Sequence, residues 1–224
     1  VNWPKTEELI QKTVPGLLKT GICLTQGFIG GTSENFTTTL GCEGSDYTAA
    51  IFAYCLRADA VTIWKDVAGM LSADPKLHPD AQLISELSYG EAIELAYYGA
   101  SVIHPKTIQP IQQINVPLHI KSFINPEEAG TSIGHFKIDH YPTCIIEKEN
   151  QILVSISTND FGFIVEDNLQ EIFSALNDRG IKIQMMENGA RSFSMCVHCE
   201  EHKLAELKNS LDRKSTRLNS SHSD

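Results

Sequence analysis

Between residues 37 and 56 the sequence changes from a polar loop with two glycines to a continuous apolar run, and this change constrains the fold most. Gly41 and Gly44 let the backbone turn sharply and approach a ligand closely. Ser45 or Asp46 is expected to cap the helix that the apolar run predicts. A helix N-terminus behind such a loop presents unpaired N–H groups and a positive dipole. The loop is therefore expected to hold an anion; a capped helix start that binds nothing is the competing interpretation.

The segments that flank this loop predict alternating strands and helices. Residues 21–26 are expected to form a short buried strand, residues 47–56 a helix, and residues 61–64 the next buried strand. Strand, helix and strand with short connections indicate an α/β fold with a layered, mainly parallel sheet. Ligands of such sheets lie beyond the carboxyl ends of the strands, so Lys65 and Asp66 are expected at a binding edge.

Composition excludes several classes of protein. The formal net charge of −10 argues against nucleic acid as a partner, because nucleic-acid binding needs clustered Lys and Arg. No apolar run reaches membrane-spanning length and no signal segment is recognisable, which favours a soluble, cytoplasmic protein without a membrane partner. The six cysteines are scattered and make no disulfide framework.

The chain divides into four parts by pattern. Residues 1–133 carry the α/β pattern and begin with an amphipathic helix over 1–18. Residues 134–142 are expected to be a linker, and residues 143–211 a second domain. Residues 212–224 are rich in serine, continue no pattern, and are expected to be an unstructured tail that is foreign to the fold.

The second domain predicts a strand over 152–157, a helix over 169–180, strands over 181–186 and 191–197, and a helix over 200–211. This order is the ferredoxin-like α+β motif without its last strand. The neighbouring residues Cys196, His198, Cys199 and His202 do not form two well-separated ligand pairs, so no metal site is predicted there.

The order of residues along the first domain closely resembles that of aspartate kinase. The motifs that carry the resemblance are Gln26-Gly27-Phe28-Ile29-Gly30, the loop from Thr37 to Tyr47, Trp64-Lys65-Asp66-Val67, Ala73-Asp74-Pro75-Lys76, Glu94-Leu95-Ala96-Tyr97-Tyr98-Gly99-Ala100 and His104-Pro105. The resemblance runs without a large gap from about residue 21 to 133, and more loosely to about 211. It implies an amino-acid kinase fold followed by an incomplete ACT regulatory domain.

The resemblance also implies a reaction, the transfer of the γ-phosphoryl group of ATP, with Mg²⁺, to the side-chain carboxylate of aspartate. Asp46 would be catalytic. The aspartate site would consist of Phe28, Thr39, Gly41, Cys42, Gly44 and Ser45, and the nucleotide site of Lys65, Asp66, Leu71, Lys76 and Ser101. Residues Asn159, Asp160, Phe161 and Gly162 would face an amino-acid effector, lysine or threonine, in a homodimer that forms through the ACT domains.

The sequence departs from the family pattern at three of these positions. Cys42 stands where the family usually has Arg, Lys76 also replaces an Arg, and Ser101 replaces a common Lys. The family's N-terminal Lys-Phe-Gly-Gly-Thr-Ser segment is absent as well. The chain is therefore interpreted as a fragment, the C-terminal part of the catalytic domain with one ACT domain, and is expected to be inactive alone.

Several other functions stay open at this stage. Carbamate, acetylglutamate and uridylate kinases share the fold and the phosphoryl chemistry. The chain could also belong to a bifunctional aspartate kinase/homoserine dehydrogenase, or act as a non-catalytic regulatory subunit that binds an amino acid.

Overall fold

The structure is a computed structural model that describes all residues except 42, 101, 139, 159–162, 213–215 and 223–224. The chain forms two compact units, residues 1–147 and residues 148–224. Each unit has its own hydrophobic core, so each is described separately.

A four-stranded sheet in the order β3-β5-β6-β4 is the centre of the first unit. Its strands are β3 (Val61–Lys65), β4 (Glu86–Ser88), β5 (Leu118–Ser122) and β6 (Thr131–Gly134). β3 pairs with β5 and β4 pairs with β6 in parallel, as the sequence predicts, whereas β5 and β6 are antiparallel. The connection between β5 and β6 is too short for a crossover, and this explains the antiparallel pair.

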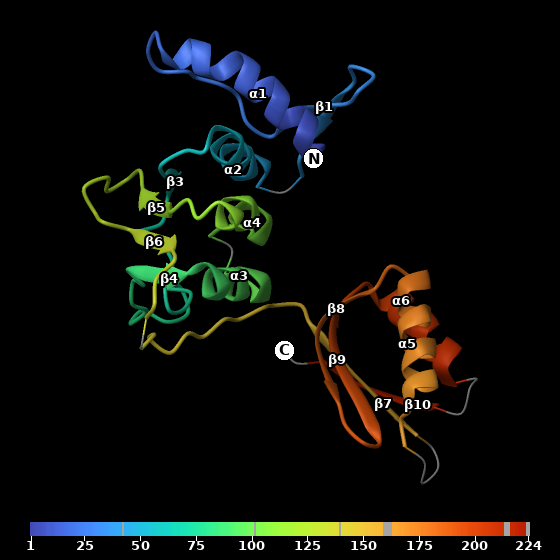
Figure 1. The fold of residues 1–224 in the computed structure, drawn as a ribbon. Helices are drawn as coiled ribbons and strands as arrows, with labels where there is room; N and C mark the ends of the chain where they lie inside the picture. The colour runs from blue at the N-terminus through green and yellow to red at the C-terminus, as the bar shows by residue number, and fades with distance from the viewer. Residues whose placement is uncertain (42, 101, 139, 159–162, 213–215, 223–224) are drawn as a thin grey trace. The chain divides into compact units, whose positions relative to one another are not determined.

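Helices cover one face of this sheet. They are α2 (Gly44–Leu56), α3 (Tyr89–Tyr98) and α4 (Pro105–Gln113), whereas α1 (Trp3–Leu18) lies outside α2. Figure 1 shows α2, α4 and α3 stacked along the same side of the strands. Alternate strand residues point into the core beneath them, among them Val61, Ile63, Leu87, Leu118, Ile120 and Ile133. The other face of the sheet is open, because Trp64 is 48% exposed with the Lys121 ammonium 5.6 Å from its ring centroid.

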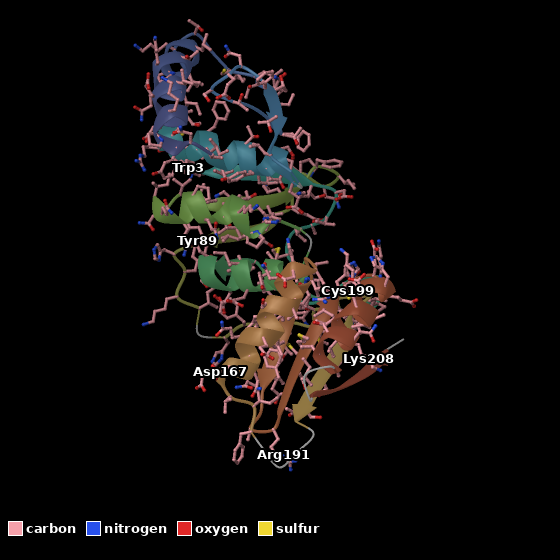
Figure 2. The ribbon with its side chains drawn as sticks, turned by 90° about the vertical axis from the view of Figure 1, so that its right-hand side faces the viewer. Trp3, Tyr89, Asp167, Arg191, Cys199 and Lys208 are labelled. Carbon is pink, nitrogen blue, oxygen red and sulfur yellow. The ribbon has the colours of Figure 1, made fainter. Side chains whose placement is uncertain are left out.

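The N-terminal helix packs on α2 through a small core of its own. Ile10 and Val14 are buried against Ile51 and Cys55. Trp3, labelled in Figure 2, lies with its ring centroid 5.0 Å from that of Tyr54. After α1 in the chain, β1 (Ile29–Gly31) and β2 (Thr37–Thr39) form an antiparallel hairpin.

The buried strand expected at residues 21–26 does not form. Ile22 and Leu24 have relative exposures of 101% and 95%, and the segment is extended but unpaired within the described part of the chain. A strand needs a neighbour for its backbone hydrogen bonds, and the first unit's sheet ends at β3 without reaching this segment.

The expected linker at 134–142 is not where the first unit ends. Residues 141–147, called the strap below, belong to this unit. Tyr141 and Cys144 pack on its core, and the Ile145 N–H donates to the Ser72 carbonyl over 2.7 Å. The boundary therefore falls after Glu147, because the strap lies against the loop that follows β3.

The second unit has the order β-α-β-β-α-β. Its elements are β7 (Ile152–Thr158), α5 (Glu166–Asp178), β8 (Lys182–Asn188), β9 (Ser192–His198), α6 (Glu201–Asp212) and β10 (Thr216–His222). The strands pair antiparallel in the order β10-β7-β9-β8. Val154, Phe193, Met195 and Leu207 lie in its core.

The expectation of an unstructured tail after residue 211 is wrong. Residues 216–222 form β10 along the edge of β7, from Thr216 opposite Thr158 to His222 opposite Ile152. Backbone N–H and C=O groups make this ladder, and backbone pairing does not require an apolar side-chain pattern. A pattern based on side chains therefore misses it.

Three further features concern the described residues as a whole. None of their helices is long and apolar enough to cross a bilayer. The described cysteines, namely Cys23, Cys55, Cys144, Cys196 and Cys199, are free thiols. No group of three or more His, Cys, Asp or Glu side chains in the described part of the chain is placed to hold a metal ion.

Candidate active site

The glycine loop and the start of α2 are arranged differently from the sequence expectation. Glu43, not Ser45 or Asp46, is the N-cap residue of α2, with a left-handed backbone at φ 52°. The helix begins at Gly44, so Ser45 and Asp46 lie in its first turn. Gly41, at φ 83°, makes the turn before it. The loop and the start of the helix thus place the Asp46 side chain in the first turn of α2.

Gly44 has a packing role in this arrangement. A Cβ atom at position 44 would lie 2.7 Å from the ring of Phe28, so only glycine allows this close approach. The Thr48 hydroxyl accepts from the Phe28 N–H over 3.0 Å and donates to the Gly44 carbonyl over 2.7 Å. The residues expected to bind the substrate are therefore held together by packing and hydrogen bonds.

An ion pair joins the loop to the end of β3. The Lys65 ammonium lies 2.7 Å from a carboxylate oxygen of Asp46, and the two side chains are only 23% and 12% exposed. Lys65 is the last residue of β3, and Asp46 lies in the first turn of α2. An ion pair shielded from solvent in this way is screened less by salt than a surface pair. The structure thus joins Asp46, the residue expected to be catalytic, to Lys65, one of the residues expected to bind the nucleotide.

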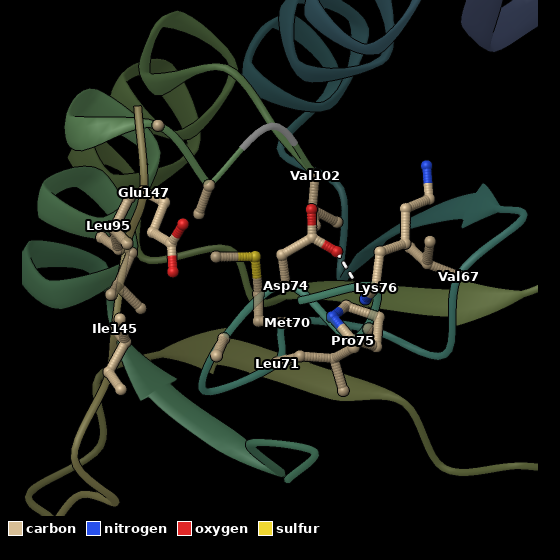
Figure 3. Close-up of a pocket in the computed structure, with 15 residues that line it drawn as sticks. Val67, Met70, Leu71, Asp74, Pro75, Lys76, Leu95, Val102, Ile145 and Glu147 are labelled. Carbon is tan, nitrogen blue, oxygen red and sulfur yellow. Dashed lines mark hydrogen bonds between the residues drawn. The ribbon is translucent and has the colours of Figure 1, made fainter. Parts of the chain in front are cut away.

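A small pocket is lined in part by the loop that follows β3. Its volume is about 260 Å³, close to the lower end of the range of roughly 300–1,000 Å³ for small-molecule sites. The lining residues, shown in Figure 3, are Val67, Gly69, Met70, Leu71, Ala73, Asp74, Pro75, Lys76, Leu95, Gly99, Ala100, Val102, Ile145, Ile146 and Glu147. The lining is mainly apolar, and charged groups come from Asp74, Lys76 and Glu147. Such a pocket suits a flat, weakly polar group that carries a charged extension.

The pocket contains two of the residues expected to bind the nucleotide, Leu71 and Lys76. The Lys76 N–H donates to a side-chain oxygen of Asp74 over 2.9 Å, which fixes the turn at Pro75. Asp66 is exposed and lies before the first lining residue, Val67. The structure thus places Leu71 and Lys76 in one pocket, whose lining includes neither Lys65 nor Asp66.

Some of the remaining expected site residues are described by the structure, and others are not. Phe28 is 43% exposed and has a left-handed backbone at φ 71°. Thr39 is the last residue of β2, and Ser45 is an exposed residue of α2. Cys42, Ser101, Asn159, Asp160, Phe161 and Gly162 lie outside the described residues. Their expected roles stay predictions.

Sequence reasoning missed the strap as part of the pocket. Ile145, Ile146 and Glu147 come from a segment that forms neither helix nor strand. No periodic pattern marks such a segment. The apolar pair Ile145-Ile146 was the one available signal, since exposed linkers are usually polar.

The donor set at the start of α2 is compatible with a divalent metal ion. Glu43 Oε2 is buried and has no hydrogen-bond partner among the described residues. Mg²⁺ prefers carboxylate oxygens and is commonly held by one or two of them together with phosphate oxygens. Glu43 and Asp46 therefore fit a Mg²⁺ ion that arrives with a nucleotide.

Comparison with known proteins gives consistent matches. The model of the "Amino acid kinase family" matches residues 4–122. The chain is 36% identical over 190 residues to bifunctional aspartokinase/homoserine dehydrogenase 2, chloroplastic, of Zea mays, a match that covers 82% of the chain and 21% of the relative.

Among solved structures, E. coli aspartokinase III in complex with lysine and aspartate (T-state) has a TM-score of 0.79 and 29% identity, with 98% of this chain and 50% of that chain covered. The same enzyme in complex with aspartate and ADP (R-state) has a TM-score of 0.78 and 28% identity, with 98% and 51% covered. The chain thus spans between about a fifth and about half of the length of these proteins.

Proposed function

The chain belongs to the amino acid kinase family, and on this premise we propose that it is part of an aspartate kinase, which phosphorylates the side-chain carboxylate of aspartate with ATP. The observation that carries the proposal is the partly buried Asp46–Lys65 ion pair, which joins the start of α2 behind the glycine loop to the end of β3. The relatives named above, a bifunctional aspartokinase/homoserine dehydrogenase and aspartokinase III, support the proposal.

In the proposed reaction a carboxylate oxygen of aspartate attacks the γ-phosphorus of ATP. A new O–P bond forms, the bond from the γ-phosphorus to the β–γ bridging oxygen breaks, and ADP leaves with that oxygen. Both reactants are anions, so catalysis depends on positioning and on neutralising charge. Mg²⁺, when bound with ATP, supplies part of that positive charge.

The chain's own residues supply the rest in this proposal. Lys65 places its ammonium at the transferred phosphoryl group, and Asp46 orients that ammonium over 2.7 Å. The N–H groups in the first turn of α2 face the same region and favour negative charge. Phe28 and Thr39, beside the glycine loop, would contact aspartate, and the apolar pocket that the loop after β3 lines would take the adenine base.

We propose that the second unit is an ACT-type regulatory domain. Its β-α-β-β-α-β order is that of the ferredoxin-like motif. E. coli aspartokinase III, a structural relative, has been solved with lysine bound. An amino acid such as lysine or threonine would bind this unit, with residues 159–162 facing it in a homodimer.

Competition among substrates tests the proposal against other members of the family. The chain is titrated in a calorimeter with aspartate, N-acetylglutamate, carbamate and UMP, each in the presence of Mg²⁺ and a non-hydrolysable ATP analogue. Aspartate should bind, and the other three acceptors should not. Binding of another acceptor in place of aspartate would contradict the assignment.

Two alternatives remain, and titration with lysine, threonine and methionine tests the second of them. The similarity to a bifunctional aspartokinase/homoserine dehydrogenase favours a chain that belongs to such a fusion. A non-catalytic regulatory subunit would bind lysine, threonine or methionine tightly but neither aspartate nor nucleotide.

A further inference from the structure

Phe28 has a backbone conformation that is unfavourable for a residue of its type. Its φ of 71° lies in the left-handed region, which bulky side chains rarely adopt. Such a backbone costs free energy in any residue except glycine and persists only where the surrounding structure holds it. The Phe28 side chain is 43% exposed, so its burial alone does not explain the conformation. The contacts of the Phe28 backbone therefore decide whether this conformation is kept.

Both polar groups of the Phe28 backbone have partners in other segments of the chain. The Phe28 N–H donates to the Thr48 hydroxyl over 3.0 Å. The Phe28 carbonyl accepts from the Leu40 N–H over 2.8 Å. The ring lies against Gly44, where an added Cβ would be 2.7 Å from it. Phe28 is thus held by the glycine loop on one side and by α2 on the other.

Thr48 is the residue of α2 that connects these parts. Its hydroxyl donates to the Gly44 carbonyl over 2.7 Å while it accepts from Phe28, and the residue is only 9% exposed. A hydroxyl can donate one hydrogen bond and accept another, so both bonds use its full capacity as a link. Gly44 and Asp46 lie in the same first turn of α2. The position of Phe28 relative to Asp46 therefore depends on one buried hydroxyl.

We infer that Thr48 is a positioning residue for the acceptor aspartate. Its hydroxyl holds Phe28 in the left-handed conformation, in which the ring forms a wall of the aspartate site. Thr48 acts through Phe28 and does not itself contact the substrate. Without the hydroxyl, the Phe28 backbone relaxes to a negative φ and the ring leaves this wall. The inference rests on the proposed function, because it requires aspartate to bind beside the glycine loop.

Calorimetric titration with aspartate, in the presence of Mg²⁺ and a non-hydrolysable ATP analogue, tests this role. Thr48→Val keeps the shape of the side chain without the hydroxyl and should weaken aspartate binding by about three- to tenfold, the effect of losing one neutral hydrogen bond. Thr48→Ser keeps the hydroxyl and should bind aspartate within about twofold of the wild type. The affinity for ADP should stay unchanged in both variants, because the pocket lining contains neither Thr48 nor Phe28.

Thr107 in α4 provides the matched control. It is fully buried, and its hydroxyl has no hydrogen-bond partner among the described residues. Thr107→Val is the same exchange in a buried helix position of the same unit, but it breaks no link between segments. It should bind aspartate like the wild type. A loss of affinity equal to that of Thr48→Val would show that any such exchange in this core disturbs the site, and would overturn the inference.

Two variants of Phe28 test whether its backbone is under strain. Phe28→Gly and Phe28→Ala both remove the ring, but only glycine adopts the left-handed conformation without cost. In urea, Phe28→Gly should therefore unfold at a higher midpoint than Phe28→Ala, the reverse of the usual order of these two residues. A midpoint of Phe28→Ala equal to or above that of Phe28→Gly would overturn the premise that Phe28 is held against strain.

Hydrogen exchange of the Phe28 amide tests the link in the unaltered chain, so that the inference can be judged even if Thr48→Val does not fold. A ligand that requires the closed hydrogen bond between Phe28 and Thr48 stabilises it. Aspartate should therefore slow the exchange of this amide in the wild type. An exchange rate that bound aspartate leaves unchanged would overturn the inference.

The outcomes separate the inference from the proposed function. If the wild type binds no aspartate, the proposed function fails and this inference with it. If the wild type binds aspartate and Thr48→Val binds it equally well, only the positioning role is overturned. If Thr48→Val weakens ADP as much as aspartate, the hydroxyl supports the whole unit and not the acceptor site, and again only the positioning role is overturned.

Discussion

At the scale of single residues, Gly130 is the position least able to change. It has φ +74°, and an added Cβ would lie 2.1 Å from the carbonyl oxygen of Ile120. A left-handed backbone costs a non-glycine residue about 1–3 kcal/mol, and the clash with the β5 backbone adds to that cost. Gly130→Ala is therefore expected to destabilise the first unit by more than about 2 kcal/mol in chemical denaturation.

Gly16 provides the matched control for Gly130. It lies within α1, and an added Cβ would meet nothing within 4 Å. Gly16→Ala should leave stability unchanged or raise it by up to about 1 kcal/mol, because alanine favours a helix over glycine. Equal effects at the two positions would contradict the description of the β5–β6 connection.

One buried and two partly buried thiols predict how the free energy of unfolding depends on pH. Burial raises the pKa of Cys55, Cys144 and Cys199 above the ordinary value of 9.0, and the Glu91 carboxylate adds to the shift at Cys144. Between the ordinary and the raised pKa the folded state binds more protons than the unfolded state, so the free energy of unfolding falls as pH rises. Urea denaturation should show lower stability at pH 10 than at pH 8, and Cys144→Ala should reduce that decrease. Stability that rises over this interval would contradict the stated pKa shifts.

At the scale of elements, α3 shows how a local sequence signal becomes structure. The Ser88 hydroxyl accepts from the Glu91 N–H over 3.2 Å and donates to the Glu91 carboxylate over 2.8 Å. The Ser-x-x-Glu pattern predicts the first of these bonds. The Ser88 N–H donates to the Tyr141 hydroxyl instead of to Glu91. Ser88→Ala should destabilise the first unit by about 1 kcal/mol. Ser85→Ala keeps the bond from the Ser132 N–H to the Ser85 carbonyl and should have a smaller effect. Thermal unfolding of the two variants compares them directly.

Most elements could be predicted from the sequence because their signals are local. For example, α4 begins at Pro105, with His104 as its N-cap. The helix α3 ends before Gly99, which has a positive φ. The partner of a strand can lie far away in the sequence, and the wrong expectations concern this pairing of strands. Residues 21–26 have the composition of a strand but no neighbouring strand in the described chain, whereas β10 pairs with β7 despite a polar sequence.

The candidate site was predictable to a similar extent. Sequence motifs selected Asp46 and Lys65 as candidates, and the structure joins them in an ion pair, while their expected roles stay predictions. The role of Gly44 against Phe28 and the contribution of the strap to the pocket depend on tertiary contacts between distant segments. Such contacts leave no periodic pattern in a single sequence.

At the scale of the whole molecule, the two separate cores predict two unfolding transitions. Leu118 in the first unit and Leu207 in the second are both fully buried. Truncation of a buried leucine to alanine typically costs about 2–5 kcal/mol. In calorimetry, Leu118→Ala should lower one transition and Leu207→Ala the other. A single transition that both variants lower equally would show that the units unfold together.

The central claim is that Asp46 and Lys65 present a positive charge to a nucleotide bound in the pocket that the loop after β3 lines, and calorimetric titration with Mg²⁺ and ADP tests it most directly. The wild type should bind with a dissociation constant below about 1 mM, in the range usual for enzyme substrates. Lys65→Met should weaken binding by about tenfold or more, the effect of losing a charge-assisted hydrogen bond. Lys106→Met, which removes an exposed charge on α4, should bind like the wild type. Absence of binding to the wild type, or equal affinity for Lys65→Met, would contradict the account.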